Sequence, residues 1–108
     1  MKHRNTYPSL LLTLALAVMP LTGQAAAKGE TLAKAKGCMA CHSVDKKIVG
    51  PAYKEVAKKY KGDAKAVTQL HDKVRKGGKG VWGQIPMPPQ TAVSDADLKT
   101  IIAWILAH

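Results

Sequence analysis

Two thiols and an imidazole lie within one short stretch of the chain, which reads Cys38-Met39-Ala40-Cys41-His42. Thiols separated by two residues can each add to one of the two vinyl groups on one edge of a porphyrin. The adjacent imidazole then lies under the ring, where its Nε2 can bind iron. This C-x-x-C-H spacing is the attachment signature of a c-type haem. The sequence therefore predicts one covalent haem c, bound through Cys38 and Cys41, with His42 as an axial ligand of its iron.

Three other uses of these side chains compete with that interpretation. A disulfide is the usual fate of cysteines in an exported protein, but it leaves His42 unexplained. A thioredoxin-like redox pair follows a β-strand, and no strand pattern precedes Cys38. A structural zinc site needs two further ligands, for which His71 and His108 are poor candidates. These comparisons favour haem attachment.

The sixth position of the iron is assigned by elimination. If an export signal is removed, the remaining methionines are Met39 and Met87. Met39 lies between the attaching cysteines and cannot reach the opposite face of the ring. Met87 lies in Ile85-Pro86-Met87-Pro88-Pro89, where proline restricts the backbone and lowers the entropy lost on ordering. We predict Met87 as the second axial ligand. His71 is the alternative and is interpreted as a partly exposed helix residue, and His108 is expected to be free.

The beginning of the chain has the composition of a secretory signal peptide. Lys2 and Arg4 precede an apolar run from Leu10 to Met19, and small residues follow up to Ala27. A membrane-spanning helix needs about 20 apolar residues, and this run is too short. We predict that residues 1–27 are a cleaved signal, with cleavage after Ala25 as the alternative. Residues 28–108 then form one periplasmic domain.

Hydrophobic periodicity predicts an all-α fold for that domain. The long glycine- and proline-rich stretch Gly77–Val93 is expected to lack a regular element. The expected helices are Glu30–Lys36, a helix between Pro51 and Gly62, Ala64–Lys76, and a last one capped by Ser94. The apolar stripe of the last helix is predicted to consist of Leu98, Ile101, Ile102, Ile105 and Leu106.

The order of motifs resembles the small bacterial class I cytochromes c, and in particular the periplasmic carriers that donate electrons to haem-containing nitrite reductases. The resemblance rests on C-x-x-C-H, then Val49-Gly50-Pro51-Ala52-Tyr53, Val81-Trp82-Gly83 and Ile85-Pro86-Met87-Pro88-Pro89. It implies about four short helices wrapped around one haem.

The resemblance also implies roles for individual residues. The Pro51 carbonyl would accept a hydrogen bond from Nδ1–H of His42, and Trp82 would donate to a haem propionate, unless it is only a packed loop residue. Gln90 would place its amide near the ligand sulfur. Thr91 departs from the family pattern because it lengthens the link to the last helix. The exposed haem edge would be ringed by Met39, Ala40, Ile48, Val49, Ile85, Pro86, Pro88 and Pro89.

Ligation by His42 and Met87 would leave no open coordination position, so the chain is expected to be an electron carrier and not an enzyme. The predicted role is delivery of electrons to a respiratory terminal reductase such as a nitrite reductase. Alternatives are donation to a terminal oxidase or a peroxidase, or a sensor with five-coordinate haem iron.

The expected partners are redox proteins that dock transiently on a monomer, with neither nucleic acid nor stable membrane insertion. The chain has 17 Lys and Arg against 7 Asp and Glu, a net charge of +10. These lysines either steer the protein toward acidic partners or form a solvated face, and the sequence leaves both open.

Overall fold

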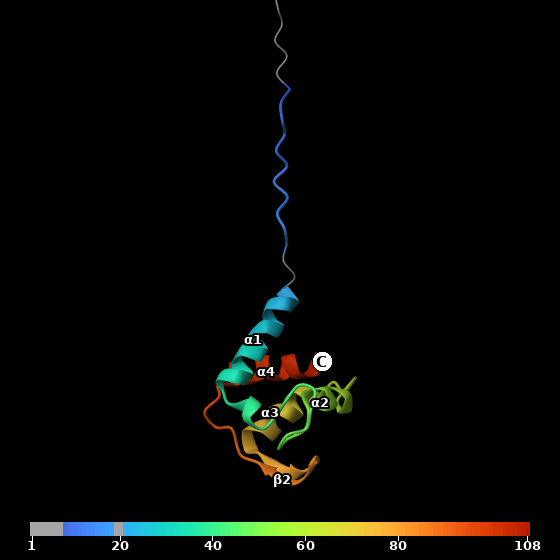
Figure 1. Cartoon of the computed structure of the whole chain (residues 1–108), viewed down its shortest axis with the longest axis vertical. Coiled ribbons are helices and arrows are strands. Elements are labelled where there is room, and N and C mark those ends of the chain that lie inside the picture. The colour runs from blue at the N-terminus through green and yellow to red at the C-terminus, as the bar shows by residue number, and fades with distance from the viewer. Residues whose placement is uncertain (1–7, 19–20) are drawn as a thin grey trace, which may run out of the picture.

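The computed structural model describes residues 8–18 and 21–108, and within these it has four α-helices, a short 3-10 turn and a small β-hairpin (Figure 1). In chain order the elements are α1 (Leu21–Ala35), η1 (Cys38–Ala40), α2 (Tyr53–Lys59), α3 (Ala66–Lys76), β1 (Gly78–Gly80), β2 (Gly83–Met87) and α4 (Asp95–Leu106).

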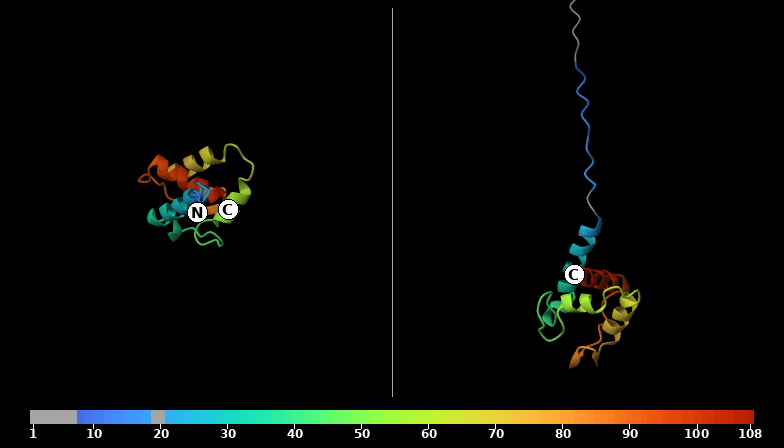
Figure 2. Two further views of the ribbon diagram at one scale, coloured as in Figure 1. Left: turned by 90° about the horizontal axis from the view of Figure 1, so that it is seen from above. Right: turned by 90° about the vertical axis from the view of Figure 1, so that its right-hand side faces the viewer.

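The apolar N-terminal run does not join the folded domain. Residues 8–18 extend away from the end of the domain where α1 begins (Figures 1 and 2). Leu10, Leu11 and Leu16 each keep more than four-fifths of their surface exposed. Among the residues that the structure describes, no helix has both the length and the apolar character needed to cross a membrane. The predicted basic start at Lys2 and Arg4 lies outside the described residues.

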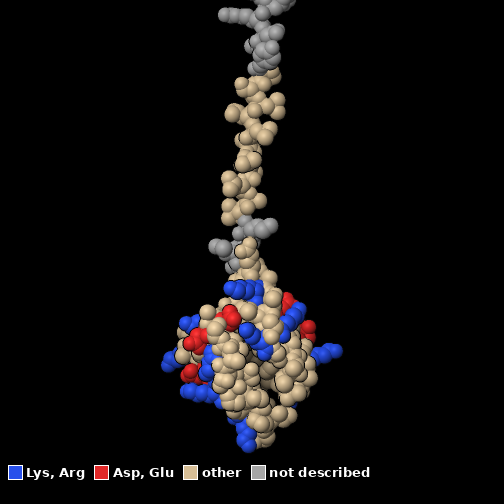
Figure 3. Space-filling view, turned by 90° about the vertical axis from the view of Figure 1, so that its left-hand side faces the viewer, with Lys and Arg blue, Asp and Glu red and all other residues tan. Residues whose placement is uncertain are grey.

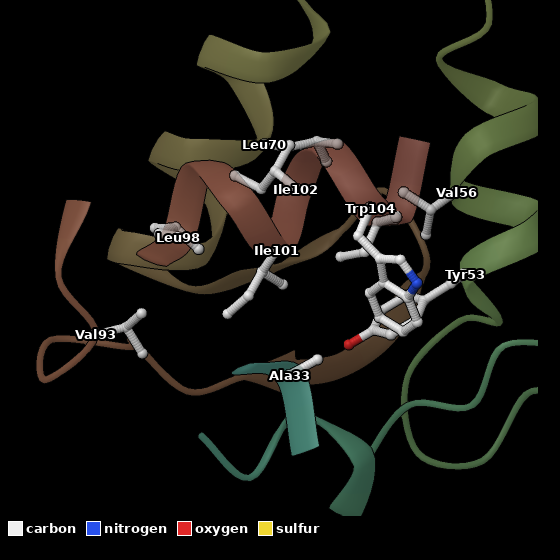
Figure 4. Packing of buried hydrophobic residues seen from close by; sticks show 10 residues of the cluster. Ala33, Tyr53, Val56, Leu70, Val93, Leu98, Ile101, Ile102 and Trp104 are labelled. Atoms are coloured by element: carbon white, nitrogen blue, oxygen red, sulfur yellow. The ribbon is translucent and has the colours of Figure 1, made fainter. Parts of the chain in front are cut away.

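Helix α4 is the centre of the fold, and its start follows from a local signal. The Ser94 hydroxyl accepts a hydrogen bond from the backbone N–H of Asp97 at 3.1 Å, which confirms the predicted cap. The acids of the first turn, Asp95 and Asp97, interact favourably with the helix dipole. Apolar side chains of α4 then pack against α1, α2 and α3 (Figure 4). Leu98 and Ile102 are the largest fully buried side chains.

One core residue falls outside the predicted stripe. Trp104 is 6% exposed and packs edge-on against Tyr53, with ring centroids 5.4 Å apart. Helix α1 approaches it closely, because a Cβ atom placed on Gly29 would lie 2.2 Å from Cβ of Trp104. A glycine in α1 therefore lets α1 and α4 meet around this indole.

Several predicted boundaries were wrong. Helix α1 begins at Leu21 rather than Glu30, because the alanines from Ala25 to Ala27 favour a helix. Helix α3 begins at Ala66 rather than Ala64, after the Asp63 carboxylate accepts a hydrogen bond from the Lys65 backbone N–H. The α2 helix ends at Lys59, before the predicted stop at Gly62.

The expectation that Gly77–Val93 lacks a regular element was also wrong. Strands β1 and β2 pair antiparallel, with Gly78 opposite Met87 and Gly80 opposite Gly83. The φ angles of Gly78, Gly80 and Gly83 are 127°, 112° and 110°, a region that side chains rarely adopt. The glycines that argued against a strand are what lets this short, irregular hairpin form. The fold remains mostly helical.

Candidate functional site

The predicted site residues line one cavity. Cys38, Cys41, His42 and Pro51 reach it from η1 and the segment after it, and Trp82 and Met87 reach it from the hairpin region. Apolar side chains complete the lining: Val56, Leu70, Val74, Val93, Leu98, Ile101, Ile102 and Ile105. The chain thus brings two thiols, an imidazole and a thioether to a single apolar space.

The two cysteines are placed by a tight turn at the end of α1. Gly37 has φ of 80°, and after it the backbone N–H of His42 donates to the Cys38 carbonyl at 3.0 Å. No disulfide joins the two cysteines; Cys38 is half-buried and Cys41 exposed. Burial raises the pKa of the Cys38 thiol. Burial also raises the pKa of Tyr53.

The imidazole of His42 is held from two sides. Its Nδ1 lies 2.9 Å from the Pro51 carbonyl oxygen, and because a carbonyl only accepts, Nδ1 carries the proton. This leaves Nε2 as the nitrogen available to a metal. The ring also stacks on Tyr53, with centroids 5.0 Å apart and planes 15° from parallel.

Gly50 is a site residue whose role sequence reasoning missed. A Cβ atom on Gly50 would lie 2.4 Å from Cε1 of His42 and 2.9 Å from both ring nitrogens. Its backbone N–H donates to the Cys41 carbonyl at 2.8 Å, so this backbone runs directly along the imidazole. The Val49-Gly50-Pro51 motif was a signal for this contact, but only Pro51 was given a role.

The hairpin region contributes Trp82 and Met87. The indole is 37% exposed, and Lys59 Nζ lies 5.7 Å from its ring centroid. Met87 is half-buried at the end of β2. Its carbonyl oxygen packs against Gly77, where a Cβ atom would lie 2.4 Å away. Gly77 therefore allows the segment that carries the thioether to pack directly on the end of α3.

Two of the remaining candidates face other groups. Nε2 of His71 is buried, 3.2 Å from Asp95 Oδ1 but not aligned for a hydrogen bond. His108 was expected to be free, and this was wrong. Its Nδ1 lies 2.9 Å from the Trp104 carbonyl oxygen, and its ring packs edge-on against that indole.

Gln90 lines the cavity, yet its side-chain amide binds main chain. Nε2 donates to the Pro88 carbonyl at 3.1 Å. The backbone N–H of Gln90 donates to the Val74 carbonyl at 3.0 Å. Gln90 thus fixes the backbone of the segment after Met87.

This set of donors suits a covalently attached haem better than the alternatives. The element before Cys38 is a helix, whereas the redox pair of a thioredoxin follows a β-strand. In the described residues, no three side chains of His, Cys, Asp or Glu are grouped so that they could hold a metal ion, as a zinc centre would require. Two cysteines not joined to each other at an apolar cavity, with one nitrogen and one sulfur donor in the same lining, match what an attached porphyrin needs.

Known proteins match over most of the chain. The family model for cytochrome c matches residues 26–108. Cytochrome c-552 of Hydrogenobacter thermophilus is 55% identical over 94 residues, which cover 87% of this chain and 94% of that protein. Cytochrome c-551 of Pseudomonas aeruginosa is 48% identical over 100 residues, covering 93% and 95%. The crystal structure of Nitrosomonas europaea cytochrome c552 is 53% identical with a TM-score of 0.69, covering 71% of this chain and 95% of that one.

Proposed function

This chain belongs to the cytochrome c family, as a class I member of the c-551/c-552 type, and from that premise we propose that it is exported and donates electrons to a respiratory terminal reductase such as a nitrite reductase. As a member of this family it carries one covalently bound haem c. It is an electron-transfer protein and not an enzyme. Its partners are therefore redox proteins that bind transiently.

We infer the ligands from the side chains that share the cavity. Cys38 and Cys41 would form the thioether bonds to the haem, and His42 and Met87 would bind its iron. The observation that carries this assignment is that all four side chains line one cavity although Met87 is remote from the others in sequence. The bound haem supplies an iron that changes charge by one electron. A thioether ligand raises the potential of such an iron.

The residues around the ligands orient them. The Pro51 carbonyl accepts a hydrogen bond from Nδ1–H of His42 and so fixes the ring plane, as the outer partners of metal-bound histidines do. Trp82 borders the cavity and keeps part of its indole exposed, which suits donation of Nε1–H to a haem propionate. Apolar side chains of α4 line the cavity and would help keep water away from the bound haem.

Export is supported by the N-terminal segment. Residues 8–18 lie outside the folded domain with their leucines exposed, and the cytochrome c match begins only at residue 26. We propose cleavage after Ala27 and a periplasmic location. N-terminal sequencing of the purified protein tests this, and a chain that keeps Leu10 in the mature form would contradict it.

Ligation is tested by absorption spectra of the oxidised protein. Methionine ligation gives a weak far-red band from charge transfer between sulfur and iron. We expect this band in the wild type and in a Met39→Leu control, and expect its loss in Met87→Ala. Retention of the band in Met87→Ala would refute the assignment. A colourless purified protein with the mass of the bare polypeptide would refute haem attachment itself.

The electron acceptor is tested by stopped-flow oxidation of the reduced protein. A haem-containing nitrite reductase, a terminal oxidase and a peroxidase are offered in turn at several ionic strengths. Lysine and arginine side chains surround the face shown in Figure 3, so we expect the rate with an acidic partner to fall as salt rises. Fast oxidation by the oxidase alone would contradict the proposed reductase.

A further inference from the structure

We propose that Arg75 is a positioning residue for Met87, holding the segment that follows Met87 against α3 and the start of α4. The inference rests on the proposed ligation by Met87. Arg75 lies in the last turn of α3, and its side chain is 25% exposed. It was not singled out from the sequence, where it is one of many basic residues.

The guanidinium joins the segment between the hairpin and α4 to the first residue of α4. Nη1 donates to the Gln90 carbonyl at 2.7 Å, and Nη2 donates to Asp95 Oδ1 at 2.8 Å. A guanidinium is planar and presents its donors in a fixed geometry. The side chain therefore fixes the distance between the Gln90 carbonyl, three residues after Met87, and the first residue of α4.

Helix α3 contacts this segment at two further points. The Val74 carbonyl accepts the backbone N–H of Gln90 at 3.0 Å. One turn later, the backbone of Gly77 packs against the carbonyl oxygen of Met87. Arg75, Val74 and Gly77 thus form a continuous support along the end of α3.

The two prolines after Met87 transmit this support to the Met87 side chain. Pro88 and Pro89 lie between Met87 and Gln90, and each restricts its own φ angle. A shift of the Gln90 carbonyl is therefore transmitted to Met87 instead of being absorbed by bond rotations between them. The same stiffness limits how far Met87 can adjust if the Arg75 hydrogen bonds are lost.

The effect should be local because the core lies elsewhere. Asp95 is largely exposed, and an exposed ion pair contributes little to global stability. The buried side chains Leu98 and Ile102 pack without Arg75. Removing the guanidinium should therefore weaken the hold on Met87 much more than it weakens the fold.

The test uses the mature holoprotein and imidazole as a competing ligand. In Arg75→Met we expect the oxidised protein to bind imidazole about tenfold more tightly than the wild type, since a charge-assisted hydrogen bond that restrains Met87 is lost. Arg75→Lys keeps a donor and should recover part of the difference. The matched control is Lys76→Met, which removes the same charge from the neighbouring exposed residue of α3.

Several outcomes decide the matter. Equal imidazole affinity in Arg75→Met and Lys76→Met would overturn the proposal. The proposal would also be overturned if, on heating, Arg75→Met lost its far-red band only at the temperature at which it loses its far-ultraviolet circular dichroism. The residue would then be merely structural. In a Met87→Ala background, adding Arg75→Met should leave imidazole affinity unchanged. Absence of the band from the wild type would instead refute the proposed ligation.

Discussion

Replacing Gly50 with alanine tests the support of His42 without touching a ligand. Gly50 is not among the glycines with positive φ, so alanine suits its backbone. Its Cβ would nevertheless lie 2.4 Å from Cε1 of His42, whereas ordinary contact begins at 3.4 Å. The ring and residue 50 must therefore separate by about 1 Å. Such a movement lengthens the 2.9 Å contact between Nδ1 and the Pro51 carbonyl beyond hydrogen-bond range.

The loss of that hydrogen bond should raise the midpoint potential. A proton shared with the carbonyl makes the imidazole a stronger donor, and this favours the ferric state. The net contribution of a hydrogen bond to stability is about 0.5–1.5 kcal/mol. If this energy is lost from the ferric state alone, the midpoint potential rises by roughly 20–60 mV, since about 59 mV corresponds to about 1.4 kcal/mol for one electron. The assay is a potentiometric titration followed by the absorption spectrum.

The control for Gly50→Ala is Gly62→Ala. Gly62 has φ of 77° and nothing within 4 Å of an added Cβ, so alanine there should cost about 1 kcal/mol of stability and leave the potential unchanged. The two variants thus separate stability from redox tuning. A folded Gly50→Ala protein with the wild-type potential would refute the reasoning, as would an equal shift in Gly62→Ala.

Three further outcomes follow from the structure. In Gly77→Ala, the backbone φ of 68° is strained and the added Cβ overlaps the Met87 carbonyl. On heating, this variant should lose the far-red band at a temperature well below that of Gly62→Ala. Loss of the band at the same temperature in both variants would contradict the contact. Ile102→Ala should lower the free energy of unfolding in urea by about 2–5 kcal/mol, because the side chain is fully buried; a loss near zero would be inconsistent with the core described. The Arg75 guanidinium holds the pKa of the Asp95 carboxyl below its usual 3.8. The stability from this pair is therefore present above that value and lost as pH falls through the lowered pKa. Because Asp95 is largely exposed, this contribution is small. As the pH is lowered, the free energy of unfolding should therefore fall slightly more in the wild type than in Asp95→Asn.

The attachment motif and the cap of α4 were predictable because their chemistry is local. Cys38, Cys41 and His42 are adjacent, so their spacing alone indicated a haem, and the family matches confirmed the covalent cofactor. Ser94 was identified as a cap because the N–H groups of a helix start need an acceptor within three residues. Met87 was chosen by elimination among methionines and by its prolines. Its place as a ligand remains a proposal.

Tertiary structure alone decided which remote groups support these residues. The backbone of Gly50 runs along the His42 ring, and the Trp104 side chain packs against the backbone of Gly29. The guanidinium of Arg75 binds a carbonyl fifteen positions away. The contacts of Gly29 and Arg75 depend on how distant segments pack and leave no periodic pattern, so composition and spacing could not predict them. The Gly50 contact left a signal in the Val49-Gly50-Pro51 motif, but not its geometry. Local spacing determines which atoms can react with a haem, whereas packing between distant segments determines how firmly each of those atoms is held.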